Sequence, residues 1–369
     1  MPQKPQKYRG CLLGGAVGDA LGYAVEFMKY GSILEKYGEN GITEYDLTFG
    51  GGKAIISDDT QMTLFTSTGL LVGETRGKMR GIMGRYEDYC YLSYLDWLTT
   101  QDRNIKDKSG YSWLSNIPEL YSSRAPGSTC LSALRSGVQG RTDAPINTSK
   151  GCGGVMRVAP VGLFLKPDIY PQEEIDRVGA EVAAITHGHD LGYLPAAMLV
   201  HIISKLVHVD MNLRTAVEDA LVAIAELYPN AEHISDLSAI IKKAMRLSEE
   251  NIPDIDAIRS LGEGWVAEET LSIAIYCALK HENDFASAVT AAVNHDGDSD
   301  STGAVCGNIM GAYLGADAIP QKFLEKLELR GVIEEIADDL YSGCPMSEYG
   351  GVHDEKWTQK YIEMTYTMI

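Results

Sequence analysis

Apolar side chains recur every three to four residues along most of this chain, and this spacing limits the possible folds more than any other feature. Residues 11–27 show it through Leu13, Val17, Leu21 and Val25. The same rhythm continues in residues 60–74, 173–187, 194–207, 212–228 and 265–282. The alternation of apolar and polar side chains that is typical of strands is nearly absent. The sequence therefore predicts an all-α fold with many helices.

Long connections rich in Gly and Pro separate these segments. They span residues 31–53, 124–130 and 145–160. Ordered loops of this length between helices tend to hold binding sites. We therefore expect the functional site to be built partly from these connections.

Two of the predicted helices carry glycine at unusual positions. In the first, Gly15 and Gly22 share one face with the acids Asp19 and Glu26. Glycine inside a helix costs about 0.5–1 kcal/mol relative to alanine, so each row indicates close packing against bare backbone. For the second row, contact between helices alone is the simplest explanation, whereas the acids on the first face favour a nearby site. The second row consists of Gly303, Gly307, Gly311 and Gly315.

Two acidic clusters lie far apart in the sequence, Ser57-Asp58-Asp59-Thr60 and Asp298-Ser299-Asp300-Ser301. Each combines carboxylates with hydroxyls at a predicted helix N-terminus. Helix capping is one explanation, because Asp58 and Gln61 have the spacing of a capping box and acids stabilise the positive helix end. Capping needs only one such residue per helix, however. If the two helix starts converge, their charges demand a cation, and a set of oxygen donors favours Mg²⁺, Mn²⁺ or Ca²⁺ over zinc.

The balance of charge and the cysteines restrict the class of protein. The chain has 51 acidic and 32 basic residues, a formal net charge of −19. Such a surface repels nucleic acid, so no nucleic-acid partner is expected. The seven cysteines are scattered, and neither a signal peptide nor a run of 18 or more apolar residues is evident. We therefore expect a reduced, cytoplasmic protein without a membrane partner.

Five segments, in this order, resemble the ADP-ribosylglycohydrolase family, which includes the dinitrogenase reductase-activating glycohydrolases and the ADP-ribosylarginine hydrolases. They are residues 10–27, 57–66, 149–163, 185–189 and 294–315. The resemblance implies a single compact, orthogonal multi-helix bundle with its active-site cleft at helix N-termini and loops. Residues 1–369 are accordingly expected to form one domain, with residues 342–369 as a C-terminal extension.

The resemblance also implies a centre of two Mg²⁺ ions, for which Mn²⁺ is a possible substitute. The ligands that it carries over are Ser57, Asp58, Asp59, Asp298, Asp300 and Ser301. Family members often have threonine at the two serine positions, and serine keeps the hydroxyl oxygen. Asp296 lies outside the shared motif and is expected to support the site or to cap a helix.

The implied reaction is hydrolysis of the bond between ribose C1 and a protein side chain, which releases ADP-ribose from an ADP-ribosylated protein. Such cleavage builds positive charge at C1. Metal ions can orient the ribose and a water molecule. Asp58 and Asp59 are the candidates for ligand and base, and Glu26 is the candidate for proton transfer with the leaving side chain.

An acidic protein must bind the pyrophosphate of ADP-ribose locally. The glycines of residues 149–154 allow consecutive N–H groups to point into one concavity, called a nest, and Lys150 can add positive charge. His187 is either near the ligand or structural, and Trp265 either flanks the ribose or adenine or belongs to the core. The substrate-binding candidates are Gly127, Ser128, Ser149, Gly151, Cys152, Gly153, His187 and Trp265.

The favoured substrate is ADP-ribosyl-arginine, and two alternatives stay open. One is a Mg²⁺-dependent hydrolase of a free ADP-ribose derivative. The other is a non-catalytic ADP-ribose-binding or crystallin-like protein, which the two intact acidic clusters disfavour. The sequence carries no signal for an oligomeric state.

Overall fold

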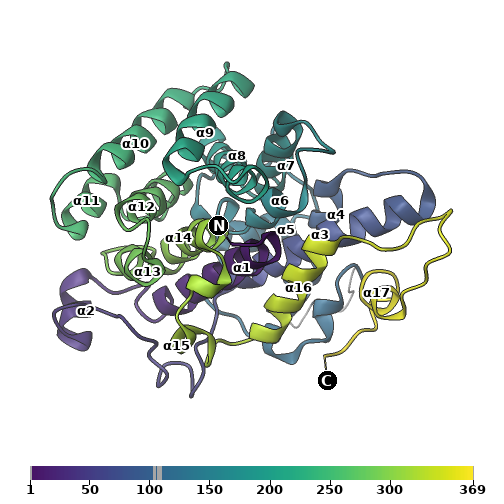
Figure 1. Cartoon of the computed structure of the whole chain (residues 1–369), viewed down its shortest axis with the longest axis horizontal. Helices are drawn as coiled ribbons and strands as arrows, with labels where there is room; N and C mark the ends of the chain where they lie inside the picture. The colour runs from purple at the N-terminus through teal and green to yellow at the C-terminus, as the bar shows by residue number, and fades with distance from the viewer. Residues whose placement is uncertain (1, 103–104, 106–109, 369) are drawn as a thin grey trace.

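The fold is known from a computed structural model, which describes residues 2–102, 105 and 110–368 (Figure 1). These ranges hold α-helices, short 3₁₀ and π turns and two isolated β-bridges, but no β-strand. The all-α prediction is therefore confirmed. The α-helices are α1 Lys4–Gly22, α2 Tyr30–Tyr37, α3 Asp58–Arg80, α4 Tyr86–Gln101, α5 Ser128–Arg135, α6 Ala159–Phe164, α7 Gln172–Ala184, α8 Asp190–Ser204, α9 Leu213–Leu227, α10 Ile234–Leu247, α11 Asp254–Leu261, α12 Ala267–Lys280, α13 Phe285–Val293, α14 Ser299–Leu314, α15 Gln321–Leu324, α16 Arg330–Ser342 and α17 Glu355–Tyr361.

Helices α1 and α14 pack against each other in the middle of the molecule (Figure 1). Their glycine rows face one another, because a Cβ atom on Gly307 would stand 2.0 Å from the carbonyl oxygen of Gly14, and one on Gly303 would stand 2.5 Å from that of Gly18. Only glycine permits so close an approach of two backbones. The second glycine row therefore serves helix packing, as the simplest explanation held.

The last turn of α1 positions both acidic clusters. Gly22 lies against the backbone of Ser299 and Asp300, where α14 begins. One turn earlier, the buried carboxylate of Asp19 accepts hydrogen bonds from the N–H groups of Ser57, at 2.9 Å, and Thr60, at 3.0 Å. α1 thus holds the starts of α3 and α14 on one side of the core.

Three boundaries differ from the sequence predictions. α1 ends at Gly22, because glycine in its last turn weakens the helical conformation. Glu26 therefore lies in the turn that follows and not on the helix. The connection 31–53 contains α2. Gly315 follows α14 as its cap with a φ of +80°, a conformation that glycine adopts without strain.

One helical stretch, residues 190–209, is long and apolar enough to cross a membrane by length and composition alone. It consists of α8 and the π turn that continues it. The sequence had been expected to hold no apolar run of this length. However, 78% of its apolar window is buried inside the protein. Burial on this scale is typical of a core helix.

The segment after α16 packs onto the outer side of α3. The indole nitrogen of Trp357, in α17, donates to the hydroxyl of Thr75 at 2.9 Å. Lys360 is buried and forms an ion pair of 2.5 Å with Asp339 of α16. The C-terminal residues therefore contact α3 and α16. They are far in sequence from both acidic clusters.

Candidate active site

Both acidic clusters line one cavity of about 400 Å³, which lies where α3 and α14 begin. Residues from α5, from the glycine-rich loop and from the loop before α12 complete its wall. The structure thus brings together two segments that are far apart in sequence, as the sequence analysis expected. The lining residues among the predicted site residues are Glu26, Asp58, Asp59, Gly127, Ser128, Gly151, Cys152, Gly153, His187, Trp265, Asp298, Asp300 and Ser301.

The first cluster starts α3, but not through the expected capping box. Ser57 is the N-cap, and its hydroxyl oxygen accepts from the N–H of Asp59 at 3.2 Å. The Gln61 side chain donates instead to the carbonyl of Ser122 at 3.1 Å. The capping-box prediction was wrong because the hydroxyl one residue earlier already occupies the capping position.

The two acids that follow differ in how well they are satisfied. Asp58 accepts a hydrogen bond from the N–H of Gly127, the residue before α5, at 3.2 Å. Asp59 is buried, and its Oδ1 has no hydrogen-bond partner among the described residues. A buried oxygen without a partner is costly, so Asp59 indicates a missing positive group.

The second cluster starts α14 and meets Glu26. Asp298 caps the helix by accepting from the N–H of Ser301 at 3.3 Å. Oxygens of Glu26, Asp298 and Asp300 lie within 4.8 Å of one another. The Oε2 atom of Glu26 is also buried without a partner in the described part of the chain. Three carboxylates therefore converge here with nothing to neutralise them.

The protonation of these acids reflects the crowding. Burial, and then the charges of Asp298 and Asp58, raise the pKa of Glu26 to about 9. Burial also raises the pKa of Asp58 to about 8, and it holds the pKa values of Asp59 and Asp300 well above their ordinary range. Without a cation, the cluster resists full ionisation at neutral pH.

A divalent cation fits this donor set. The converging atoms are carboxylate oxygens with the nearby hydroxyl of Ser301, and two of them lack partners. No Lys or Arg is among the described residues that line the cavity. Oxygen donors of this kind suit hard ions such as Mg²⁺ or Mn²⁺. The sulfur-bearing residues Cys130, Cys152 and Met156 also line the cavity. Burial holds the pKa of Cys152 well above the ordinary value, so it stays a thiol and donates to Asp298 at 2.8 Å.

The glycine-rich loop, residues 149–154, offers the cavity fewer free N–H groups than the sequence predicted. The N–H of Gly151 donates to the hydroxyl of Ser149 at 3.4 Å, and that of Cys152 donates to the carbonyl of Trp265 at 3.2 Å. Gly153 and Gly154 belong to the 3₁₀ turn that starts at Cys152, where N–H groups have no intrahelical partner. An anion in the cavity would therefore meet the second half of the loop.

His187 lies beneath this loop. Its ring is almost fully buried, yet it lines the cavity. A Cβ atom on Gly151 would stand 3.3 Å from its Nε2, and one on Gly153 would stand 3.0 Å from its Cε1. Burial, and then the charge of Arg157, lower its pKa to about 3, so the imidazole is neutral. Of the two possible roles for His187, its position favours the one near a ligand.

Two exposed aromatic rings stand at the cavity. Trp265 is 39% exposed and Phe27 is 75% exposed. Their rings stack at 5.9 Å between centroids with an angle of 20°. Trp265 is therefore not a core residue, which was the other possibility. Large exposed apolar side chains beside a cavity are typical of binding surfaces.

Some predicted residues lie outside the cavity wall. Ser57 is fully buried behind Asp59, where it caps α3. Ser149 hydrogen-bonds to Thr129 at 3.1 Å and supports the loop from outside. Lys150 does not line the cavity, and its ammonium group forms an ion pair with Glu268. Asp296 accepts from the N–H of Tyr30 at 2.9 Å and thereby caps α2.

Three residues that matter for the geometry were not among the predicted site residues. Asp19 holds the start of α3, and only its place on the glycine face hinted at this. Phe27 follows Glu26 and gave no separate signal. Arg157 is fully buried behind the cavity, and a single Arg in an apolar segment has no pattern that would reveal it.

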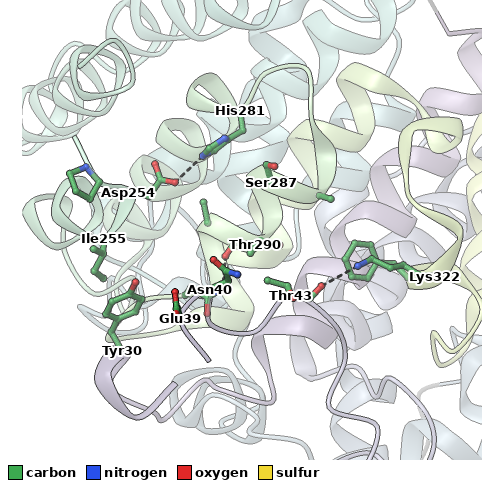
Figure 2. A pocket seen from close by; sticks show the side chains of 15 residues that line it. Tyr30, Glu39, Asn40, Thr43, Asp254, Ile255, His281, Ser287, Thr290 and Lys322 are labelled. Atoms are coloured by element: carbon green, nitrogen blue, oxygen red, sulfur yellow. Dashed lines mark hydrogen bonds and ion pairs between the residues drawn. The ribbon is translucent and has the colours of Figure 1, made fainter. Parts of the chain in front are cut away.

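A second cavity, of about 530 Å³, lies between α2, α11 and α13 (Figure 2). Several of its polar side chains have partners among the described residues. Asp254 accepts from Tyr276 at 2.6 Å and lies 2.9 Å from the Nε2 of His281. Among the described side chains that line it, none has a buried polar atom without a partner. The larger cavity therefore shows no demand for a ligand.

Known proteins that resemble this chain include members of the family that the sequence motifs indicated. The model of the ADP-ribosylglycohydrolase family matches residues 1–349. An ADP-ribosyl-[dinitrogen reductase] glycohydrolase of Rhodospirillum rubrum is 26% identical over 89% of this chain and 92% of its own. The ADP-ribosylarginine hydrolase Tri1 of Pseudomonas putida (strain GB-1) is 24% identical over 93% of this chain and 80% of its own.

A solved structure has the same fold. It is an ADP-ribosylglycohydrolase-related protein complex, with a TM-score of 0.64 and 26% identity. The alignment covers 93% of this chain and 99% of that one. The match extends over the whole arrangement of helices that holds the cavity.

Proposed function

The chain belongs to the ADP-ribosylglycohydrolase family, and from this premise we propose that it is a Mg²⁺-dependent hydrolase that removes ADP-ribose from modified arginine side chains of proteins. The observation that carries the proposal is the pair of buried, unpartnered carboxylate oxygens, on Asp59 and Glu26, in the cavity that both clusters line. Hydrolysis of an ADP-ribose linkage is the activity of the family. The metal, the arginine linkage and the residue roles are the parts that we add.

We assign the metal site to Asp58, Asp59, Asp298, Asp300 and the hydroxyl of Ser301. Ser57 supports it through its hydrogen bonds with Asp59, at 3.2 and 3.3 Å. Bound Mg²⁺ would supply charge that orients the ribose and its attacking water. Two ions would account for the number of converging carboxylates, and Mn²⁺ suits the same donors.

Glu26 is assigned to proton transfer at the leaving side chain. In the metal-free protein, burial and then the neighbouring acids raise its pKa to about 9. Its place in the same cavity as both acidic clusters lets it exchange a proton with the departing nitrogen. Asp58 and Asp59 face the same cavity, where they can take a proton from water and stabilise positive charge at C1. The cavity also provides Gly153 and His187 for the pyrophosphate and ribose.

The surroundings of Glu26 favour a cationic leaving group. Phe27 and Trp265 present stacked rings beside Glu26 in the cavity wall. A guanidinium is attracted both by aromatic faces and by carboxylates. A serine-linked ADP-ribose would gain neither interaction. The name of the Pseudomonas putida relative points to the same linkage.

The experiment is a substrate panel with purified protein and Mg²⁺. We expect release of ADP-ribose from an ADP-ribosyl-arginine protein, and at least about tenfold slower release from serine-linked substrates and free ADP-ribose derivatives. Trp265→Ala should narrow this difference, because about 1 kcal/mol of cation–π attraction is lost. Equal rates on all substrates would contradict the arginine assignment, and no release from any would contradict the enzyme.

We also propose a cytoplasmic location. All seven cysteines are free thiols, six of them buried. Free thiols are typical of a reducing compartment.

A further inference from the structure

Arg157 is a buried cation without an anionic partner. Its side chain is 0% exposed, in a protein whose net charge is −19. No carboxylate forms an ion pair with it within the described ranges, and its Nε has no hydrogen-bond partner there. The guanidinium instead stacks on the ring of Tyr94, 4.4 Å from the centroid. Buried charges are normally paired, so Arg157 requires an explanation.

The donors of Arg157 point toward the helix end that carries His187. Nη2 donates to the carbonyl of Val182 at 3.1 Å and to the hydroxyl oxygen of Thr186 at 2.7 Å. Nη1 makes only long contacts of 3.5 Å with the sulfurs of Cys130 and Met62. The hydrogen bond to Thr186 is the shortest that the guanidinium forms.

Thr186 passes this interaction on to His187. The hydroxyl oxygen of Thr186 lies 2.8 Å from Nδ1 of His187. A guanidinium can only donate, so the hydroxyl accepts from Arg157 and keeps its own proton to give away. If that proton goes to Nδ1, then Nδ1 is unprotonated and the neutral ring carries its proton on Nε2. In the competing arrangement, Nδ1 donates to Thr186 and the hydroxyl donates to the sulfur of Cys130, which is a weak acceptor.

We propose that Arg157 and Thr186 are positioning residues that fix His187 as the neutral tautomer with its proton on Nε2, so that the ring donates into the cavity. Nε2 makes no hydrogen bond within the described part of the chain, and it lies at the edge beneath Gly151. The acceptor would be an oxygen of a phosphate or of a ribose hydroxyl. Only the identity of that acceptor rests on the proposed function.

A neutral donor suits this cavity. An imidazolium would be drawn to the carboxylates of the two clusters, whereas a neutral N–H donates to a ligand oxygen without that competition. The fixed charge of Arg157 opposes protonation of the ring and adds positive potential behind an anionic ligand. Arg157 thus acts on the ligand through Thr186 and His187 and not by contact.

The test is a long-range ¹H–¹⁵N NMR spectrum of protein labelled with ¹⁵N-histidine, without ligand. His187 is assigned among the eight histidines by the loss of its pattern in His187→Gln. In the wild type we expect a single neutral tautomer with the proton on Nε2 from pH 5.5 to pH 8. A proton on Nδ1, or a doubly protonated ring at pH 7, would overturn the proposal without any variant.

Variants of Thr186 test the relay, by which we mean the hydrogen bonds from Arg157 through Thr186 to His187. They separate it from an effect of packing alone. Thr186→Val keeps the shape but removes the hydroxyl, so we expect both tautomers to appear and the affinity for ADP-ribose to fall about tenfold. Thr186→Ser should restore the wild-type pattern and an affinity within about twofold. The control is Thr63→Val, which removes a buried hydroxyl that donates only to the carbonyl of Met156, at 3.3 Å. It should leave the pattern of His187 unchanged.

The outcomes also distinguish the relay from the proposed function. If the wild-type pattern persists in Thr186→Val, the relay is wrong even when the enzyme is active. If the protein neither binds ADP-ribose nor releases it from any substrate, the proposed function fails, while the nitrogen spectrum still decides the tautomer.

Discussion

Two cavities among the described residues differ in whether their charged groups have partners. In the larger one, between α2, α11 and α13, Asp254 contacts His281 (Figure 2). Asp254 also accepts a hydrogen bond from Tyr276, which lies outside the cavity wall. The smaller one holds carboxylates from both acidic clusters, and Glu26 and Asp59 each have a buried oxygen without a partner. Unsatisfied charge, and not size, therefore marks the smaller cavity as the candidate active site.

The largest expected effect is on activity. Asp300→Asn should reduce kcat by roughly 10²–10⁴-fold, because it removes a charged donor from the cluster while keeping the shape of the side chain. Asp254→Asn in the larger cavity is the matched control and should keep kcat within about threefold. Steady-state rates with an ADP-ribosyl-arginine protein measure both. A large loss in Asp254→Asn with none in Asp300→Asn would reverse the assignment of the two cavities.

The next effect compares the α1–α14 contact, which supports the smaller cavity, with α2, which lines the larger one. Gly307→Ala places a methyl 2.0 Å from the carbonyl oxygen of Gly14, so α1 and α14 must separate. We expect a loss of about 1–3 kcal/mol in the free energy of unfolding, together with weaker metal binding. Gly31→Ala in α2 meets no atom within 4 Å and should be neutral or stabilising by up to about 1 kcal/mol. Denaturant titration compares them, and equal effects would show that the close contact is not required.

The last two effects concern the pH dependence of stability. Burial raises the pKa of Asp58 from 3.8 to about 8. Its contribution to stability is therefore full below its ordinary pKa and is lost as the pH rises through about 8. At pH 8.5, Asp58→Asn should be about 1–3 kcal/mol more stable than the wild type without metal. Saturating Mg²⁺ should reverse the order, since a ligand at 100 times its Kd adds about 2.7 kcal/mol to the wild type.

Asp254 is expected to respond with the opposite sign. Burial raises the pKa of Asp254, but hydrogen bonds from His281 and Tyr276 outweigh this effect and hold the pKa below its ordinary value. Its contribution is present above the ordinary pKa and is lost as the pH falls. Asp254→Asn should therefore be about 0.5–1.5 kcal/mol less stable at pH 8.5, with or without Mg²⁺. Chemical denaturation at pH 5 and 8.5 tests both variants, and a shared sign would remove the distinction between the cavities.

The parts of the site that the sequence revealed are those encoded locally. Each cluster places carboxylates beside hydroxyls within four residues at a helix start. The sequence alone therefore predicted Asp58, Asp59, Asp298 and Asp300 as site residues, and the structure brings them to one cavity. The helical rhythm likewise predicted the all-α class. Such features depend on neighbouring residues along the chain.

The parts that it missed depend on packing between distant segments. Gly22, the last residue of α1, packs against the start of α14. The sequence does not show this contact, and it predicted Glu26 on the helix although Glu26 lies in the turn that follows. Ser57 caps α3 and does not line the cavity, and its predicted role as a metal ligand stays a prediction. The position of Arg157 behind His187 depends on Thr186, on another segment.

Diffraction from crystals soaked in Mn²⁺, at a wavelength where manganese scatters anomalously, tests the central claim most directly. Our account predicts anomalous peaks between the carboxylates of Asp58 and Asp59 and those of Asp298 and Asp300, and none beside Asp254. An ordered peak only in the larger cavity, or none between the two clusters at saturating Mn²⁺, would contradict it.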